Sequence, residues 1–137
     1  MLIRDCLPTD EVFSFCSTDG TVDQSWNASA IARAVKDGTL VPGMEFIMEL
    51  NEEFYQKVFP NAGVEEEHLA TITEERLKDP VFCLQLNDES HVLLDGNHRA
   101  VKAYRLGKGE VPALMFTEAQ LKPYVIEDLP AAREFLK

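Results

Sequence analysis

Residues 91–116, HVLLDGNHRAVKAYRLGKGEVPALMF, constrain the fold of this chain more than any other segment. The apolar run at residues 92–94 predicts a strand that stops abruptly at Asp95-Gly96. Residues 100–106 then predict a helix, and residues 111–116 predict a second strand. Because a helix lies between the two strands, we expect them to be parallel.

The rest of the chain adds elements of both kinds, which indicates a small mixed α/β fold. Residues 81–86 and 91–95 predict a hairpin with its turn at residues 87–90. Met44, Phe46 and Met48 alternate with Glu45, Ile47 and Glu49, which is typical of a half-buried strand. Thr71 and Glu74 fit a capping box at the start of a helix, and so do Thr117 and Gln120 further on.

The N-terminal part predicts a separate short helix. Asn27 or Ser29 fits its first cap, and Gly38 fits its end. The sequence therefore predicts an N-terminal extension, residues 1–40, and a main domain, residues 41–137, which ends in a helix over residues 128–137.

Charge and composition limit the possible functions. The chain has 24 acidic and 13 basic residues, a net charge of −11, which opposes direct binding to DNA because that needs Lys and Arg on phosphates. No apolar run approaches the ~18 residues of a membrane span, and no N-terminal signal pattern occurs, so we expect a cytoplasmic protein. Cys6, Cys16 and Cys83 match no metal or redox spacing.

The basic residues gather where the acidic residues are absent. Residues 45–79 carry ten acids, whereas residues 96–109 carry none and hold four of the thirteen basic residues. A local positive field in an otherwise negatively charged protein predicts a site for a small anion rather than for a long polyanion.

The turn at Gly96 is the predicted binding site for that anion. Basic residues at a helix start oppose the helix dipole. A strand that ends in glycine and turns into a helix, however, exposes backbone N–H groups that bind phosphate, and His98 and Arg99 add charge-assisted hydrogen bonds. The competing interpretation is turn chemistry alone, with Asp95 as the cap and Asn97 in a left-handed conformation.

The helix that follows leaves a second question open. His98, Lys102 and Arg105 lie at i, i+4 and i+7 and therefore share one face. Either this face lines a pocket, or it is solvated.

This combination resembles the ParB/sulfiredoxin superfamily. The shared features are an apolar strand, a DGxHR-type turn, a helix, a glycine and a strand that begins Val-Pro, and they cover about residues 72–116. The resemblance implies a small α/β fold in which the turn binds nucleotide phosphates. DGNHR, residues 95–99, is most similar to the DG-His-His-Arg turn of free-serine kinases in this superfamily. Sulfiredoxins carry a reactive cysteine where this chain has Asn97, so their chemistry is not expected.

The resemblance implies roles for individual residues in a phosphotransferase or NTPase. A nucleoside triphosphate or diphosphate is the implied cofactor, with Mg²⁺ beside its phosphates. A general base has to come from elsewhere, and the acids that follow the strand at residues 44–49 are the candidates: Glu49, Glu52 and Glu53. The predicted catalytic residues are Asp95, His98, Arg99 and Glu52; the predicted nucleotide-binding residues are Gly96, Asn97, His98, Arg99 and Lys102; the predicted Mg²⁺ ligand is Asp95.

Two alternatives to a nucleotide-dependent enzyme stay open. One is a non-catalytic interaction module, such as a phage- or plasmid-type inhibitor of a host factor, which would contact a basic partner through the acidic residues 45–79. The other is a ParB-like nuclease, against which the net charge argues.

Overall fold

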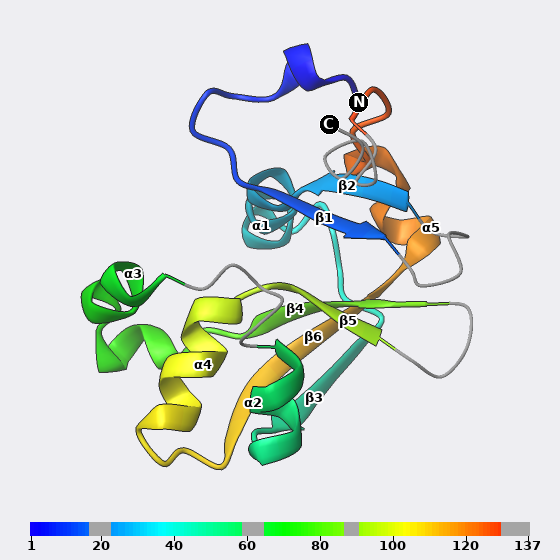
Figure 1. Ribbon diagram of the computed structural model, residues 1–137. Coiled ribbons are helices and arrows are strands. Elements are labelled where there is room, and N and C mark those ends of the chain that lie inside the picture. The colour runs from blue at the N-terminus through cyan, green and yellow to red at the C-terminus, as the bar shows by residue number, and fades with distance from the viewer. Residues whose placement is uncertain (17–22, 59–64, 87–90, 130–137) are drawn as a thin grey trace. The chain divides into compact units, whose positions relative to one another are not determined.

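The computed structural model describes residues 1–16, 23–58, 65–86 and 91–129. The chain divides into two compact units (Figure 1): Met1–Val41 with Thr117–Lys137, and Pro42–Phe116. The sequence places its boundary one residue earlier and keeps residues 41–137 together. In the structure, the described residues that follow Phe116, 117–129, belong to the N-terminal unit instead.

The second unit is built on a four-stranded sheet in the order β3-β6-β4-β5. Strand β3 (Met44–Glu49) runs antiparallel to β6 (Glu110–Thr117), and β4 (Val81–Gln85) runs antiparallel to β5 (His91–Asp95). The predicted strand at residues 44–49 and the predicted hairpin are therefore confirmed, although the hairpin turn itself, residues 87–90, lies outside the described residues. The two central strands, β6 and β4, are parallel, so the sheet is mixed.

The expectation that β5 and β6 are parallel is wrong. Strand β4 lies between them, antiparallel to β5 and parallel to β6, so β5 and β6 run in opposite directions. The connecting helix thus links strands that are not neighbours. Parallel strands need a long crossover connection, but a helical connection does not require the two strands that it joins to be parallel.

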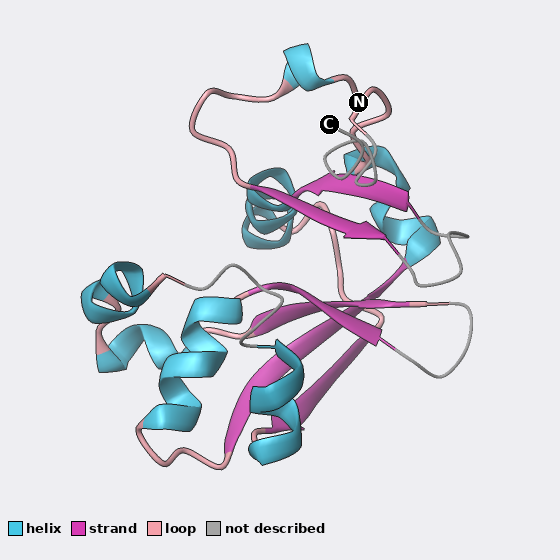
Figure 2. Ribbon diagram, in the orientation of Figure 1, coloured by secondary structure: helices cyan, strands magenta, loops and turns pink. Residues whose placement is uncertain are grey.

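Three helices of this unit lie together beside the sheet (Figure 2): α2 (Glu52–Val58), α3 (Glu66–Thr71) and α4 (Asn97–Arg105). Helix α4 contacts both of the others. Its small apolar residues, Ala100, Val101 and Ala103, are buried against residues of β3, β4 and β6 in one hydrophobic core. The small side chains let the helix approach the strands closely, which fixes the position of its first turn.

The predicted capping box at Thr71 is displaced by two residues. Thr71 is the last residue of α3, and Thr73 instead caps a 3₁₀ turn, η2 (Glu74–Lys78), by accepting a hydrogen bond from the N–H of Arg76. The sequence has a threonine at both positions, and only tertiary packing selects between them.

The first unit contains a hairpin of β1 (Val12–Cys16) and β2 (Asp23–Asn27), followed by α1 (Ala28–Asp37). Asn27 caps α1 by accepting a hydrogen bond from the N–H of Ala30 at 2.9 Å, and Gly38 ends it with a φ of 84°. The helix prediction is therefore confirmed, with Asn27 and not Ser29 as the cap. The capping box at Thr117 and Gln120 is also confirmed, at the start of α5 (Glu118–Leu121).

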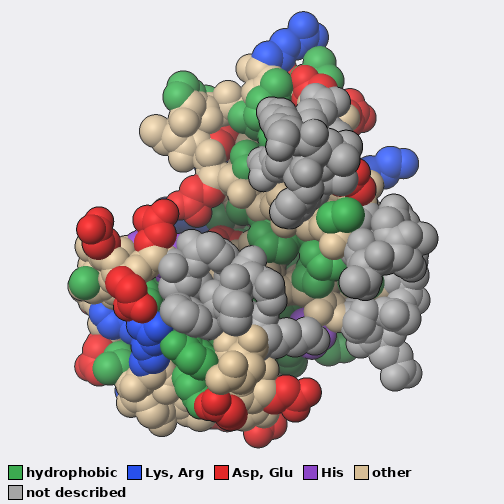
Figure 3. Space-filling model, in the orientation of Figure 1, with side chains coloured by type: hydrophobic (Ala, Val, Ile, Leu, Met, Phe, Trp, Pro, Cys, Tyr) green, Lys and Arg blue, Asp and Glu red, His purple; other side chains and the backbone are tan. Residues whose placement is uncertain are grey.

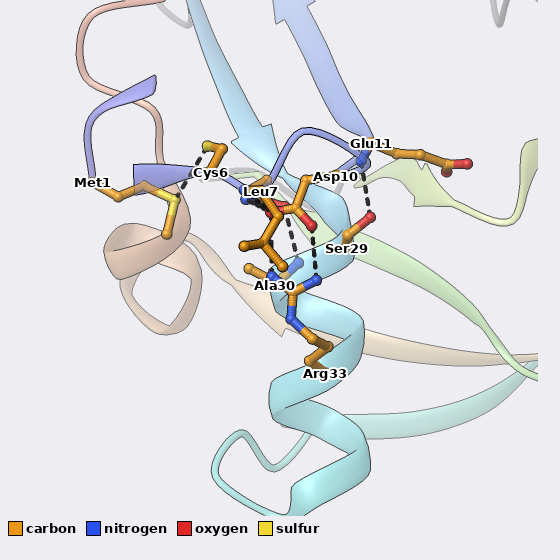
Figure 4. Close-up of polar contacts among 9 residues, drawn as sticks. Met1, Cys6, Leu7, Asp10, Glu11, Ser29, Ala30 and Arg33 are labelled. Atoms are coloured by element: carbon orange, nitrogen blue, oxygen red, sulfur yellow. Dashed lines mark hydrogen bonds and ion pairs between the residues drawn. The ribbon is translucent and has the colours of Figure 1, made fainter. Parts of the chain in front are cut away.

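A polar cluster around Asp10 joins the N-terminal loop to α1 (Figure 4). The Asp10 carboxylate accepts hydrogen bonds from the guanidinium of Arg33 at 2.8 and 3.2 Å, from the Asn27 amide at 2.8 Å and from the N–H of Leu7 at 2.9 Å. Its side chain is only 2% exposed.

The C-terminal segment completes this unit. The 3₁₀ turn η3 (Lys122–Tyr124) follows α5, and the N–H of Ile126 then donates to the carbonyl of Ser25 at 2.8 Å. Most of the helix predicted over residues 128–137 lies outside the described residues. Within the part of the chain that the structure describes, no helix is long and apolar enough to cross a membrane.

Candidate functional site

The DGNHR turn lies at the edge of the sheet where β5 ends and where β4 begins. Gly96 is the N-cap of α4 and has a φ of 100°, a left-handed conformation that favours glycine. A Cβ atom on Gly96 would lie 2.6 Å from Cγ1 of Val81, the first residue of β4. The glycine is therefore required both by the backbone conformation and by the neighbouring strand.

This geometry corrects the turn-chemistry interpretation. Asp95 is the last residue of β5 and not the helix cap, and Asn97 is the first residue of α4 with helical geometry. Among the described residues, no residue other than glycine has a positive φ. The left-handed position is therefore Gly96 itself.

Arg99 folds back over the turn. Its Nη1 donates to the carbonyl of Pro80 at 3.3 Å, and its Nη2 lies 3.1 Å from the position that a Cβ atom on Gly96 would take. The half-buried guanidinium is therefore held beside the first turn of α4, where backbone N–H groups have no partner within the helix.

His98 faces the neighbouring helix α3. Its ring stacks on that of His68, with ring centroids 4.1 Å apart and an interplanar angle of 18°. Its Nε2 accepts a hydrogen bond from the N–H of Glu65 at 3.2 Å, which requires that this nitrogen carries no proton.

Lys102 and Arg105 hold the same helix. The Nζ of Lys102 donates to the carbonyl of Leu69 at 2.8 Å and to that of Ile72, at the C-terminal end of α3. Arg105 forms an ion pair with Glu66 at 2.7 Å. The ammonium of Lys102 is favourable at the C-terminal end of α3 because a cation there complements the helix dipole. Arg105 pairs instead with Glu66 in the first turn of α3.

The basic face of α4, which consists of His98, Lys102 and Arg105, is thus neither an open pocket nor simply solvated. It binds α3. Figure 3 shows basic side chains gathered over the region of α3 and α4, with acidic side chains around them. The charges of Lys102 and Arg105 are therefore met by partners within the same unit, the carbonyls of Leu69 and Ile72 and the carboxylate of Glu66.

Glu52 is not brought to the turn. Its carboxylate accepts a hydrogen bond of 2.6 Å from the hydroxyl of Tyr104, near the C-terminal end of α4. This bond, followed by one from the Gln56 amide, holds the pKa of Glu52 below its usual value. Tyr104 lies seven residues after Asn97, about 10 Å along the helix at 1.5 Å per residue. A general base has to reach the reacting group within about 3 Å or through one water.

The other acids fall into two groups. Asp95 is half-buried at the end of β5, directly before the turn. Glu49 and Glu53 are exposed, at the end of β3 and in the first turn of α2. No group of three His, Cys, Asp or Glu side chains that could hold a metal ion occurs among the described residues.

The three cysteines differ in exposure: Cys6 is half-buried, Cys16 is exposed and Cys83 is buried. Cys83 is buried in β4, and burial raises the pKa of its thiol to about 12. A thiol that stays protonated at neutral pH is a poor nucleophile.

Sequence reasoning missed the residues that lock the three helices together. Tyr55 of α2 stacks on Tyr104 of α4 with ring centroids 5.0 Å apart, and its hydroxyl accepts hydrogen bonds from Arg105. No local signal could have found this cluster, because α2 and α4 lie about 50 residues apart in the chain.

Comparisons with known proteins add no assignment. No protein-family model matches the chain, and no curated protein or solved structure matches it. The resemblance to the ParB/sulfiredoxin superfamily therefore stays a prediction that rests on residues 72–116.

Proposed function

We propose that this protein binds a nucleoside triphosphate or diphosphate through the turn Gly96–Arg99 and uses it as an NTPase or phosphotransferase. The observation that carries the proposal is the conformation of this turn. A glycine cap has no side chain to accept hydrogen bonds from the first-turn N–H groups of α4, and a guanidinium lies beside them. Phosphate oxygens are suitable acceptors for both.

Each residue of the turn has a role in this proposal. The backbone N–H groups of Asn97 and His98 bind phosphate oxygens, and Arg99 neutralises charge on the same group. Arg99 has this capacity because a guanidinium carries five N–H donors, and one of them serves the carbonyl of Pro80. Lys102 contributes only if it exchanges the carbonyls of Leu69 and Ile72 for phosphate.

Mg²⁺ fits this arrangement through a single protein ligand. Magnesium in nucleotide sites is held by one or two carboxylates together with phosphate oxygens and water. Asp95, directly before the turn, is the carboxylate that we assign to the metal, and the metal would neutralise phosphate charge. Glu52, the predicted general base, lies instead beside Tyr104 near the other end of α4.

The test is a dye-based thermal-shift screen of ATP, ADP and CTP, each with and without Mg²⁺. A nucleotide at a hundred times its Kd adds about 2.7 kcal/mol of stability. We expect Arg99→Ala to abolish the shift and Arg76→Ala to retain it, because Arg76 is exposed on η2 in the same unit. The absence of a shift with every nucleotide, or an equal shift in Arg99→Ala, contradicts the proposal.

A second candidate function is a non-catalytic interaction module. The observation that favours it is the engagement of His98, Lys102 and Arg105 with α3, which gives the local positive charge a structural purpose. This candidate predicts a nucleotide screen without shifts and a binding surface elsewhere in the molecule.

A further inference from the structure

Strand β3 forms one edge of the four-stranded sheet and pairs with β6 on its inner side. The N–H of Leu50 donates to the carbonyl of Gly109 at 2.9 Å, which fixes the phase of this antiparallel ladder. Because hydrogen-bonded and non-hydrogen-bonded pairs alternate, the backbone groups of Met44, Phe46 and Met48 face β6. Those of Glu45, Ile47 and Glu49 face the outer edge.

The identity of the residue opposite Ile47 agrees with this phase. Pro112 of β6 stands opposite Ile47 and has no N–H to donate. Among the described residues, no strand pairs with the outer edge of β3. A row of outward N–H and C=O groups is a template for an added strand.

The side chains along this edge are exposed in a regular order. Ile47 is 59% exposed, and Glu45 and Glu49, two residues to either side, are also exposed. Ile47 borders an open hollow of about 710 Å³ whose apolar lining includes Val111 and Pro112. Charged residues also line it: Glu74, Glu75, Glu110, Lys78 and Lys108.

We propose that β3 binds an extended segment of another protein as an added antiparallel strand. Residues directly opposite one another on neighbouring strands lie on the same face with Cβ atoms roughly 5 Å apart. The partner residues opposite Glu45 and Glu49 are therefore basic, and the residue between them, opposite Ile47, is apolar and contacts Ile47 beside the hollow. The partner motif is basic–x–apolar–x–basic.

A second copy of this chain is not the occupant. Antiparallel pairing of β3 with β3 around Ile47 would set Glu45 opposite Glu49 of the other copy on both sides, and like charges directly opposite are destabilising. The net charge of −11 adds a further repulsion between two copies.

The experiment measures binding of a fluorescent Lys-x-Ile-x-Lys peptide to the whole chain by anisotropy, with Glu-x-Ile-x-Glu as the matched peptide. We expect Glu45→Lys/Glu49→Lys to weaken the lysine peptide about tenfold or more and to bind the glutamate peptide instead. Glu11→Lys/Glu127→Lys, which makes the same change of net charge in the first unit, should bind as the unaltered chain does. Circular dichroism confirms that each variant is folded.

Ile47→Pro removes one outward N–H together with the Ile47 side chain, so Ile47→Ala, which removes only the side chain, is its matched control. Proline is tolerated on an edge strand where its N–H faced solvent, so the fold should persist while one outward donor is lost. Weaker peptide binding in Ile47→Pro than in Ile47→Ala supports strand addition, and equal binding in the two variants contradicts it. The proposal is overturned by no binding of the lysine peptide, by binding that the two Lys substitutions in β3 leave unchanged, or by light scattering that shows a dimer which Ile47→Pro dissolves.

Discussion

At the scale of single residues, Gly96 is fixed by its neighbours as well as by its own conformation. The left-handed φ could be met by any glycine turn, but Val81 also occupies the space where a side chain would begin. This contact ties the end of β5 to the start of β4. The first turn of α4 is thereby positioned by the sheet and not by a side-chain cap.

Replacing Gly96 by alanine should therefore cost about 2–4 kcal/mol of unfolding free energy, from backbone strain and from overpacking against Val81. Gly38→Ala is the matched control, because Gly38 has a similar φ of 84° with nothing within 4 Å of an added Cβ atom. It should lose about 1 kcal/mol from strain alone. Urea unfolding of the two variants measures the difference, and equal losses would show that Val81 moves aside freely.

Asp10 should make stability depend on pH in the acidic range. Hydrogen bonds from Arg33, Asn27 and the N–H of Leu7 hold the pKa of this carboxyl well below its usual value. A depressed pKa contributes stability that is present above the unfolded-state pKa, about 3.9, and that is lost as the pH falls below it. At pH 7, Asp10→Asn should therefore have a lower unfolding free energy than the unaltered chain. The difference between the two unfolding free energies should narrow below pH 4.

Urea unfolding between pH 2 and pH 7 tests this expectation. Asp79→Asn serves as the control, because the Asp79 side chain is 57% exposed and lies 3.9 Å from Arg76. Exposed pairs of this kind contribute little. If the difference in unfolding free energy between Asp10→Asn and the unaltered chain stays constant with pH, the role assigned to the Asp10 carboxylate is contradicted.

The residues of the candidate site were predictable only in part. A glycine turn after an apolar strand depends on neighbouring residues. The turn at Gly96 and the helix that follows it could therefore be predicted from the sequence. The partners of Lys102 and Arg105 lie on α3, about 30 to 40 residues earlier. A helical face rich in basic residues looks the same in sequence whether it binds a ligand or another helix.

At the scale of elements, Lys102 should decide how firmly α3 is attached. Lys102→Met keeps the apolar stem and removes the ammonium that serves the carbonyls of Leu69 and Ile72. We expect a loss of about 1–2 kcal/mol, since hydrogen bonds to charged groups are among the stronger ones. Hydrogen exchange in α3 should accelerate as its C-terminal end loosens.

Hydrogen exchange followed by mass spectrometry measures this change over residues 66–71. Lys108→Met is the control, because Lys108 is exposed in the loop after α4. If both variants exchange α3 at the same rate, the ammonium of Lys102 does not hold the helix.

Elements set by local chemistry were predicted well, and elements set by distant partners were not. Helix α1 was correct from Asn27 to Gly38, because both of its caps are adjacent in sequence. The hairpin of β1 and β2 was missed, since its strands mix polar and apolar residues and are stabilised by Trp26 and the C-terminal segment. The direction of β5 relative to β6 depends on the insertion of β4, which no local pattern records.

At the scale of the whole molecule, the acidic surface should make stability depend on salt. With 24 acidic and 13 basic residues, the folded chain concentrates negative charge, and salt screens this repulsion over about 10 Å at 0.1 M. We expect the melting temperature to rise as NaCl increases from 0.05 to 0.5 M. A fall over this range would mean that ion pairs such as that of Arg105 with Glu66 outweigh the general repulsion.

The position of the single tryptophan affects how the two units can be observed. Trp26 is 1% exposed in the first unit, whereas the stacked tyrosines Tyr55 and Tyr104 belong to the second. Tryptophan emission therefore reports on the first unit. Tyrosine emission comes from both units, with two of the three tyrosines, Tyr55 and Tyr104, in the second and Tyr124 in the first. Thermal unfolding can be followed by tryptophan and by tyrosine emission. Different midpoints for the two signals indicate that the units unfold separately, and equal midpoints indicate that they unfold together.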